Sequence, residues 1–320
     1  MRPSFAKFEE TNFGIEKKSI YPFLHSNPMR NFSQSHEWLS INTATIRKSK
    51  GVELPLPQII EACVERGIGA ISPWRDQVAA AGLPVISKLV KDHGLQLSGY
   101  CRGGMFPAAD AAGIGAADLD NRKAVDEACE LNAKCLVLVV GGLPGALAGK
   151  AAHKDIALSR TQVHDGIAKL LEYAKVCGMP LAIEPLHPMY AADRACINTM
   201  EQALDVCDAL DPDRTGTLGV AVDVYHVWWD PKLQSQIQRA GQKRLLAFHV
   251  CDWLTPTTDL LNDRGMMGDG VIDIPKIRAW VEAEGFNGFS EVEIFSTGNW
   301  WQQDHFKVLD TCIERYKTAV

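Results

Sequence analysis

Short apolar runs of β-type composition recur along the chain from about residue 38. Each run is followed by a longer segment whose apolar residues recur at helical spacing, a combination that indicates a strand and then a helix. Eight runs show this arrangement, at residues 38–46, 68–74, 95–101, 134–142, 180–186, 217–225, 245–253 and 289–295. The pattern therefore predicts eight strand-then-helix units.

The helical segments carry ordinary start and stop signals. Residues 55–67 have Pro near the start, apolar residues at helical spacing and Gly after the last turn. Other helices are predicted at residues 119–132, 159–178, 198–211 and 273–285. Because parallel strands need a crossover connection, strands that alternate with helices predict a parallel sheet.

Eight such units favour a closed (β/α)8 barrel over a doubly wound sheet. No linker or shift of composition divides the chain. We therefore predict an α/β fold with one barrel domain at residues 36–320. Residues 1–35 lack strong periodicity, and we interpret them as an N-terminal extension that packs on the barrel.

Composition narrows the range of functions. The net charge of −6 has no long basic block, which argues against a nucleic-acid partner. The most apolar segment is too short and too rich in Gly and Pro to span a bilayer, so no membrane role is expected. Nine cysteines without a CxxC pair or a secretory leader indicate reduced thiols in a cytoplasmic protein. Small-molecule chemistry is the best remaining interpretation.

Metal-type side chains stand at the ends of four late strands. Chemistry in an α/β barrel lies at the carboxyl ends of the strands, so these positions matter most. The four are Glu184, Asp223, His249 and Glu293. Mostly oxygen ligands with one imidazole suit a single divalent ion such as Mn²⁺, Mg²⁺ or Co²⁺, with Zn²⁺ also compatible. The alternative is that each residue is separately satisfied by a backbone group or an arginine.

The order of the strand-end motifs resembles the xylose isomerase-like barrel superfamily of sugar isomerases and epimerases. "IEPLHP", "DVYH", "FHVCDW" with the later "DRGMMGDGVID", and "GFNGFSEVEIF" carry the resemblance over residues 36–318. It implies a TIM barrel in which the four side chains bind one divalent metal. It also implies that Glu184 and Glu293 act as acid and base on opposite faces of the substrate.

Two further residues match positions that contact substrate in that superfamily. His226 follows Asp223 by three residues, and Arg264 precedes the glycines of "GDG". The resemblance implies that both donate to sugar oxygens. The structural alternatives are that His226 caps a loop and that Arg264 pairs with Asp263 or Asp269 on the surface.

The segment after the fifth strand departs from the superfamily pattern, because it reads "LHPMYAADR" where sugar epimerases often carry Asn, Arg and a second Glu. His187 in this segment is a candidate substrate contact, although a structural hydrogen bond explains it equally well. Arg75 and Arg102 follow the second and third strands, where they could bind a carboxylate, a phosphate or a polyol. They could also balance nearby acids.

These residues predict a metal-dependent sugar or sugar phosphate isomerase or epimerase that removes a proton next to a carbonyl. The expected partner is a small sugar or cyclitol, and a homo-oligomer is compatible with the sequence. A lyase acting on a keto-inositol or 3-keto-sugar would use the same site. An endonuclease acting at abasic sites is less favoured, because Trp74, Arg75, Tyr100 and Arg102 stand where it needs extra histidines. A sugar-binding barrel without catalysis would not need the complete ligand set.

Overall fold

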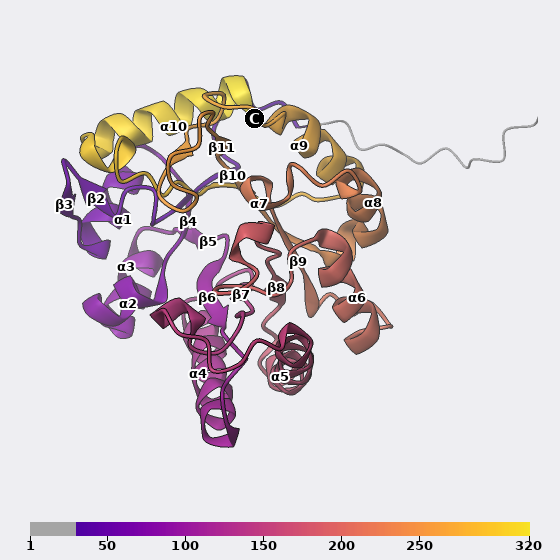
Figure 1. Cartoon of the computed structure of the whole chain (residues 1–320). Coiled ribbons are helices and arrows are strands. Elements are labelled where there is room, and N and C mark those ends of the chain that lie inside the picture. The colour runs from indigo at the N-terminus through magenta and orange to yellow at the C-terminus, as the bar shows by residue number, and fades with distance from the viewer. Residues whose placement is uncertain (1–29) are drawn as a thin grey trace, which may run out of the picture.

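The eight apolar runs form the eight parallel strands of a barrel. The computed structural model describes residues 30–320, and its ring of strands lies inside a ring of helices (Figure 1). Nine hydrogen-bonded pieces make the sheet, in the order β5-β4-β1-β13-β10-β9-β8-β7-β6. Their bounds are β1 Leu39–Asn42, β4 Ala70–Ser72, β5 Gln96–Leu97, β6 Tyr100–Gly104, β7 Leu136–Val139, β8 Leu181–Ile183, β9 Leu218–Asp223, β10 Leu245–Val250 and β13 Ser290–Val292. The predicted single TIM barrel is confirmed.

The third predicted strand is split into two pieces, and this split closes the ring. β5 pairs with β4 on one side, and β6 pairs with β7 on the other. The register of β6 against β7 shifts between Cys101 and Gly103, which leaves Arg102 as the extra residue of a bulge. A bulge of this kind redirects the side chain of the extra residue. The strand also continues to Gly104, beyond the predicted end at residue 101.

Helices follow the strands in the predicted alternation. The long helices have the bounds α1 Leu56–Glu65, α2 Arg75–Ala81, α3 Leu83–Asp92, α4 Ala111–Glu130, α5 Ile156–Cys177, α6 Met200–Leu210, α8 Leu233–Arg244, α9 Ile274–Ala283 and α10 His305–Ala319. A short helix, α7 Val224–Val227, follows β9 directly. Helices α2 and α3 are separated at Gly82, whose φ of 91° ends the first of them. No helix within residues 30–320 has the length and apolarity needed to cross a membrane.

Short additional elements decorate the barrel. Two small antiparallel pairs and three 3-10 helices lie outside the main sheet. Their bounds are β2 Lys48–Ser49, β3 Val52–Glu53, β11 Asp252–Trp253, β12 Arg264–Gly265, η1 Ala146–Ala148, η2 Pro188–Tyr190 and η3 Trp300–Gln302. All nine cysteines are free thiols, which agrees with the predicted reduced state. The pairing of β11 with β12 brings Arg264 back towards the strand ends.

Most of the predicted N-terminal extension lies outside the described residues, and its extent stays a prediction. Arg30 and Phe32 contact α9 and α10. The Arg30 guanidinium bonds to the Glu282 carboxylate at 3.0 Å, and the Phe32 ring stacks on the Tyr316 ring with centroids 4.5 Å apart. Phe32 is buried, so this part of the chain contributes to the core.

The end of the third strand is held from the side by Asn121 of α4. Its side-chain amide nitrogen donates to the carbonyl of Gly104 at 2.8 Å, and its oxygen accepts from the Gly104 backbone N–H at 2.6 Å. Asn121 is buried, so these are hydrogen bonds that water cannot replace. We call these two hydrogen bonds between Asn121 and Gly104 the Asn121 clamp. The clamp fixes the backbone directly after the Arg102 bulge.

We expect Asn121→Ala to lower the free energy of unfolding by about 2–4 kcal/mol, because two buried backbone groups lose their partner. Urea unfolding of the full chain measures this change. Leu119→Ala, at an exposed position of the same helix, is the matched control and should change stability by less than about 0.5 kcal/mol. Equal effects of the two substitutions would contradict the clamp.

Candidate metal centre

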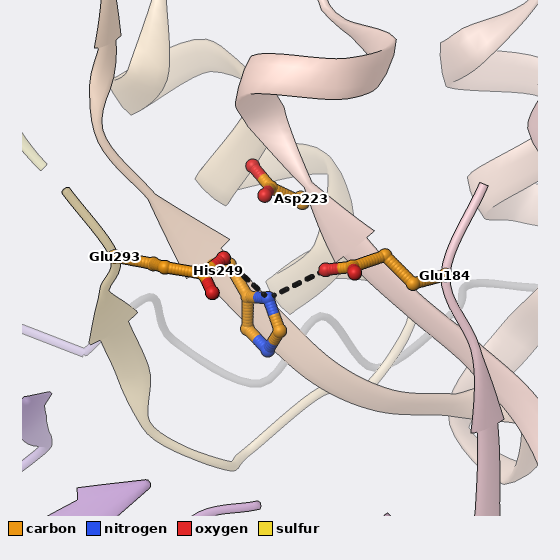
Figure 2. Close-up of side chains that lie close together, drawn as sticks. All are labelled: Glu184, Asp223, His249 and Glu293. Carbon is orange, nitrogen blue, oxygen red and sulfur yellow. Dashed lines mark hydrogen bonds and ion pairs between the residues drawn. The ribbon is translucent and has the colours of Figure 1, made fainter. Parts of the chain in front are cut away.

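The four predicted ligands meet at the carboxyl ends of their strands. Figure 2 shows Glu184 and Glu293 on either side of His249, with Asp223 close by. One donor atom from each side chain lies within 4.8 Å of a donor from every other. The His249 Nδ1 is 3.0 Å from a Glu184 oxygen and 3.6 Å from a Glu293 oxygen. All four residues are buried, so they form an acidic and histidine cluster able to hold a metal ion.

Strand geometry explains why these four side chains converge. Side chains alternate between the two faces of a strand, so residues two apart share a face. Ala182, Ala221 and Ala247 pack together inside the barrel. Glu184, Asp223 and His249 each follow one of these alanines by two residues. Small alanine side chains thus lie inside the barrel, and each candidate ligand lies on the same face of its strand, two residues nearer to the carboxyl end.

Both glutamates carry shifted acidities. Burial raises the pKa of Glu184 to about 7, although its hydrogen bond with His249 opposes this effect. Burial also acts to raise the pKa of Glu293, but His249 and Arg264 outweigh it and lower that pKa to about 2. The difference arises because Glu293 faces two cationic side chains. A divalent ion at the cluster would supply the same kind of compensation to both carboxylates.

The sequence analysis missed Glu291. This residue precedes Glu293 by two positions in β13 and therefore points into the barrel, where it is buried. Its carboxylate accepts hydrogen bonds from Asn42 and Ser98, each at 2.8 Å, and lies 3.7 Å from the His249 Nε2. Burial lowers the pKa of His249, but Glu291 and the other carboxylates outweigh it and hold the pKa well above its usual range. The two-residue period in "SEVEIF" was the signal that could have found Glu291.

Arg264 lies inside the site, not on the surface. Its Nη1 donates to the carboxylates of Asp223 at 3.1 Å and Glu293 at 3.3 Å. The guanidinium also lies over the Tyr225 ring, 4.4 Å from the centroid. The surface pairing with Asp263 or Asp269 that the sequence allowed is therefore wrong. Arg264 orients two of the four candidate ligands, and its contact with substrate remains a prediction.

His226 is held in a fixed orientation beside Asp223. The backbone N–H of His187 faces its Nδ1 at 3.2 Å, and a neutral ring can accept a hydrogen bond at only one of its two nitrogens. Nε2 lies 3.6 Å from an Asp223 oxygen and 3.1 Å from the Arg264 Nη2. Burial lowers the pKa of His226 to about 3, which keeps the ring neutral.

His187 acts through its backbone, because its ring lies away from the cluster. The ring packs against Trp253, with centroids 4.9 Å apart, and edge-on against Trp229. The N–H of Met189 donates to His187 Nδ1 at 3.3 Å, which caps the short helix η2. The structural alternative thus accounts for this side chain.

A hollow opens beside the cluster. Of the two arginines predicted to bind substrate, Arg102 lines this hollow and Arg75 does not. The hollow is lined by Glu184 and Glu293 together with the predicted residues His226, Arg264 and Arg102. Arg194, which the sequence analysis did not single out, also lines it. Only its place in "LHPMYAADR", after the fifth strand, pointed to it.

Arg75 does not line this hollow. Its guanidinium is bonded to the Glu127 carboxylate at 2.8 Å and to both oxygens of Asp120 at 2.9 and 3.0 Å. Arg75 thus balances acids of α4, as the alternative interpretation expected, and its role in substrate binding stays a prediction.

The comparisons with known proteins agree with the motifs. A family model described as a xylose isomerase-like TIM barrel matches residues 60–311, which is well over half of the chain. The chain belongs to this family. The resemblance predicted from the strand-end motifs is thereby confirmed.

Individual members of the xylose isomerase-like family align with most of the chain. Inosose isomerase of Bacillus velezensis is 24% identical over 292 residues, which are 88% of this chain and 94% of that protein. The crystal structure of protein SMc04130 from Sinorhizobium meliloti 1021 is 56% identical, with a TM-score of 0.83, and covers 89% of this chain and 99% of that one. The IolI protein, solved with a zinc atom, is 18% identical with a TM-score of 0.71, over 86% and 95% of the two chains, and shows a shared fold.

We expect Arg264→Met to lower the free energy of unfolding by about 3–5 kcal/mol in chelator-treated protein, because it leaves two buried carboxylates without their cation. Urea unfolding in the presence of a chelator tests this expectation. Arg122→Met is the control, because Arg122 makes a half-exposed pair with Asp118 on α4. A loss no larger than that of the control would show that Arg264 does not compensate the cluster.

Proposed function

We propose that the protein is a divalent-metal-dependent isomerase or epimerase of a carbonyl sugar or cyclitol. The observation that carries the proposal is the convergence of Glu184, Asp223, His249 and Glu293 in one buried cluster, two members of which, Glu184 and Glu293, line a hollow. Three oxygen-donor side chains and one imidazole suit Mn²⁺, Mg²⁺, Co²⁺ or Zn²⁺. The relative named inosose isomerase and the zinc-containing IolI structure support the same assignment.

A bound divalent ion would act as a Lewis acid for the negative charge that develops on substrate oxygens when a neighbouring C–H proton leaves. The chain itself supplies the proton transfer. Glu184 and Glu293 come from different strands and lie on either side of His249 (Figure 2). This arrangement supports removal of the proton by one carboxylate and its return by the other, as epimerisation requires.

His226 and Arg264 would orient the substrate in this site. Both residues line the hollow, and both are buried. The Arg264 guanidinium can donate to a substrate oxygen, and its Nη2 lies 3.1 Å from the His226 Nε2. Donors fixed by hydrogen bonds and ion pairs can hold sugar oxygens without further ordering of the side chains.

A lyase would need an acid that protonates the leaving oxygen. Tyr190 and Tyr225 are near the cluster, but both phenols donate to the backbone carbonyl of Leu260. His226 has a pKa lowered by burial to about 3, which makes it a poor match for an acid at neutral pH. These contacts favour reprotonation of the substrate carbon, and hence an isomerase or epimerase over the lyase alternative.

The two remaining alternatives have less support. Within residues 30–320 a single group of metal-type ligands comes together, whereas the endonuclease chemistry considered above needs extra histidines. The strand-two and strand-three ends instead carry Trp74, Arg75 and Arg102. A non-catalytic sugar-binding barrel would have no need for a buried cluster of carboxylates that Arg264 and His249 compensate only in part, which is costly to maintain.

We expect the chelator-treated protein to bind one divalent ion per chain. At a hundredfold excess of Mn²⁺ or Zn²⁺ over Kd, binding should add about 2.7 kcal/mol to the free energy of unfolding. Elemental analysis gives the stoichiometry, and thermal melts with and without metal give the stabilisation. His249→Ala should lose most of the stabilisation, while Glu201→Gln, on the surface of α6, should keep it. Three zinc ions per chain would instead support the nuclease alternative.

We expect the metal-loaded protein to exchange a substrate C–H proton with D₂O, and Glu184→Gln and Glu293→Gln to slow this exchange by about 10²–10⁴-fold. NMR over a panel of ketoses, keto-inositols and 3-keto-glycosides measures the exchange and identifies the product. Glu201→Gln serves again as the control. Elimination products would favour the lyase, and full exchange in both glutamine variants would overturn the assigned acid and base.

A further inference from the structure

Two arginines in the hollow have no carboxylate partner at hydrogen-bond distance, although other arginines nearby do. Arg47 bonds to the Asp76 carboxylate at 2.7 Å, and Arg75 is held by Asp120 and Glu127. Within residues 30–320, Arg102 forms no ion pair, and Arg194 reaches only its neighbour Asp193, at 3.9 Å. The hollow therefore contains guanidinium donors that the folded chain leaves unused.

Arg102 is placed in the hollow by the third strand. It is the extra residue of the β6 bulge, and the Asn121 clamp on Gly104 holds the backbone just beyond it. Burial and the nearby guanidinium groups of Arg194 and Arg75 lower the pKa of Arg102. Like charges placed close together are unfavourable, and the nearby Glu184 carboxylate offsets this only in part.

Arg194 approaches from the segment that follows the fifth strand. Its backbone carbonyl accepts the N–H of Gly141 at 2.9 Å, and its own N–H donates to the carbonyl of Tyr190 at 3.1 Å. These bonds anchor the position from which the side chain extends. Its Nε is buried without a hydrogen-bond partner. The guanidinium also lies over the Tyr190 ring, 5.6 Å from its centroid, so the side chain is held in place while its hydrogen-bond donors stay available to a ligand.

The third arginine of the hollow is already compensated. Arg264 is bonded to Asp223 and Glu293, and Glu184 is bonded to His249. The other lining residues near the arginines are apolar, among them Leu147 and Leu261. The hollow is thus lined by two residues of the metal-type cluster, by apolar side chains and by two arginines without a hydrogen-bonded carboxylate.

We propose that Arg102 and Arg194 form an oxyanion subsite, so that the substrate is a ketose or keto-cyclitol bearing a carboxylate or a phosphate away from the reacting carbonyl. This inference rests on the proposed function of the neighbouring cluster. The planar guanidinium groups match the paired oxygens of both anions. A neutral polyol would leave the two positive charges uncompensated.

Binding of matched probes to Mn²⁺-loaded protein tests the subsite. The probes are D-tagatose, D-tagaturonate and D-tagatose 6-phosphate, measured by calorimetry at low and high salt. We expect the carboxylate or the phosphate probe to bind at least about tenfold more tightly than the neutral sugar, since charge-assisted hydrogen bonds are strong. The preference should shrink at high salt. Which acidic probe is preferred identifies the anion.

Substitutions of the two arginines test whether they cause the preference for acidic probes. Arg102→Gln and Arg194→Gln should each remove most of the acidic preference, because they weaken binding of the acidic probes much more than binding of D-tagatose. Arg102→Lys, which keeps the charge without the planar fork, should retain part of it. Arg47→Gln is the matched control in the adjoining hollow and should keep the full preference. Thermal melts check that every variant is folded.

The proposal is overturned if neither acidic probe binds better than D-tagatose, or if Arg47→Gln reduces the preference as much as the two test variants. Its failure is distinct from failure of the proposed function. Proton exchange without an acidic preference would retain the enzyme and remove the subsite. An acidic preference without proton exchange would retain the subsite and remove the isomerase.

Discussion

The candidate site depends on the cost of burying three carboxylates beside one another. Glu184, Asp223 and Glu293 lie out of solvent within reach of a single imidazole, and such a group cannot persist without positive charge. The chain supplies part of that charge through Arg264 and His249. The remaining demand is what makes a divalent cation the natural occupant. The position of Arg264 beside Asp223 and Glu293 follows from this constraint.

The fold and the ligand set were predictable because they follow from local, periodic signals. Alternating strand and helix patterns predict the barrel, and the rule that strand ends meet at one face brings Glu184, Asp223, His249 and Glu293 together. Glu291 was predictable by the same two-residue period but looked like an ordinary strand residue. The strand bulge at Arg102 was not, because it depends on how β6 pairs with β7 and on the clamp from Asn121.

The different roles of the arginines could not be predicted from the sequence. Arg75 and Arg102 were both predicted at the end of a barrel strand, and nothing in the amino-acid sequence around them distinguishes their roles. In the fold, Asp120 and Glu127 of α4 take up the donors of Arg75, whereas Arg102 faces the hollow without such a partner. His187 is a similar case, because its ring joins Trp253 and only its backbone N–H reaches His226. Which hydrogen-bond partner each side chain finds depends on tertiary contacts, and these cannot be read from the spacing of residues in the sequence.

The hydrogen bonds of Glu291 also tie the two sides of the hollow together. One carboxylate oxygen binds Asn42 in β1, and the other binds Ser98, between β5 and β6. The strand that carries Glu293 is therefore braced, across the barrel interior, against the strand that carries Arg102. Fully satisfied buried hydrogen bonds such as these rigidify the structure around them, with or without a ligand. The fold itself therefore sets the distance between the metal-type cluster and Arg102, and under the proposed function this distance would limit the length of substrate that reaches both.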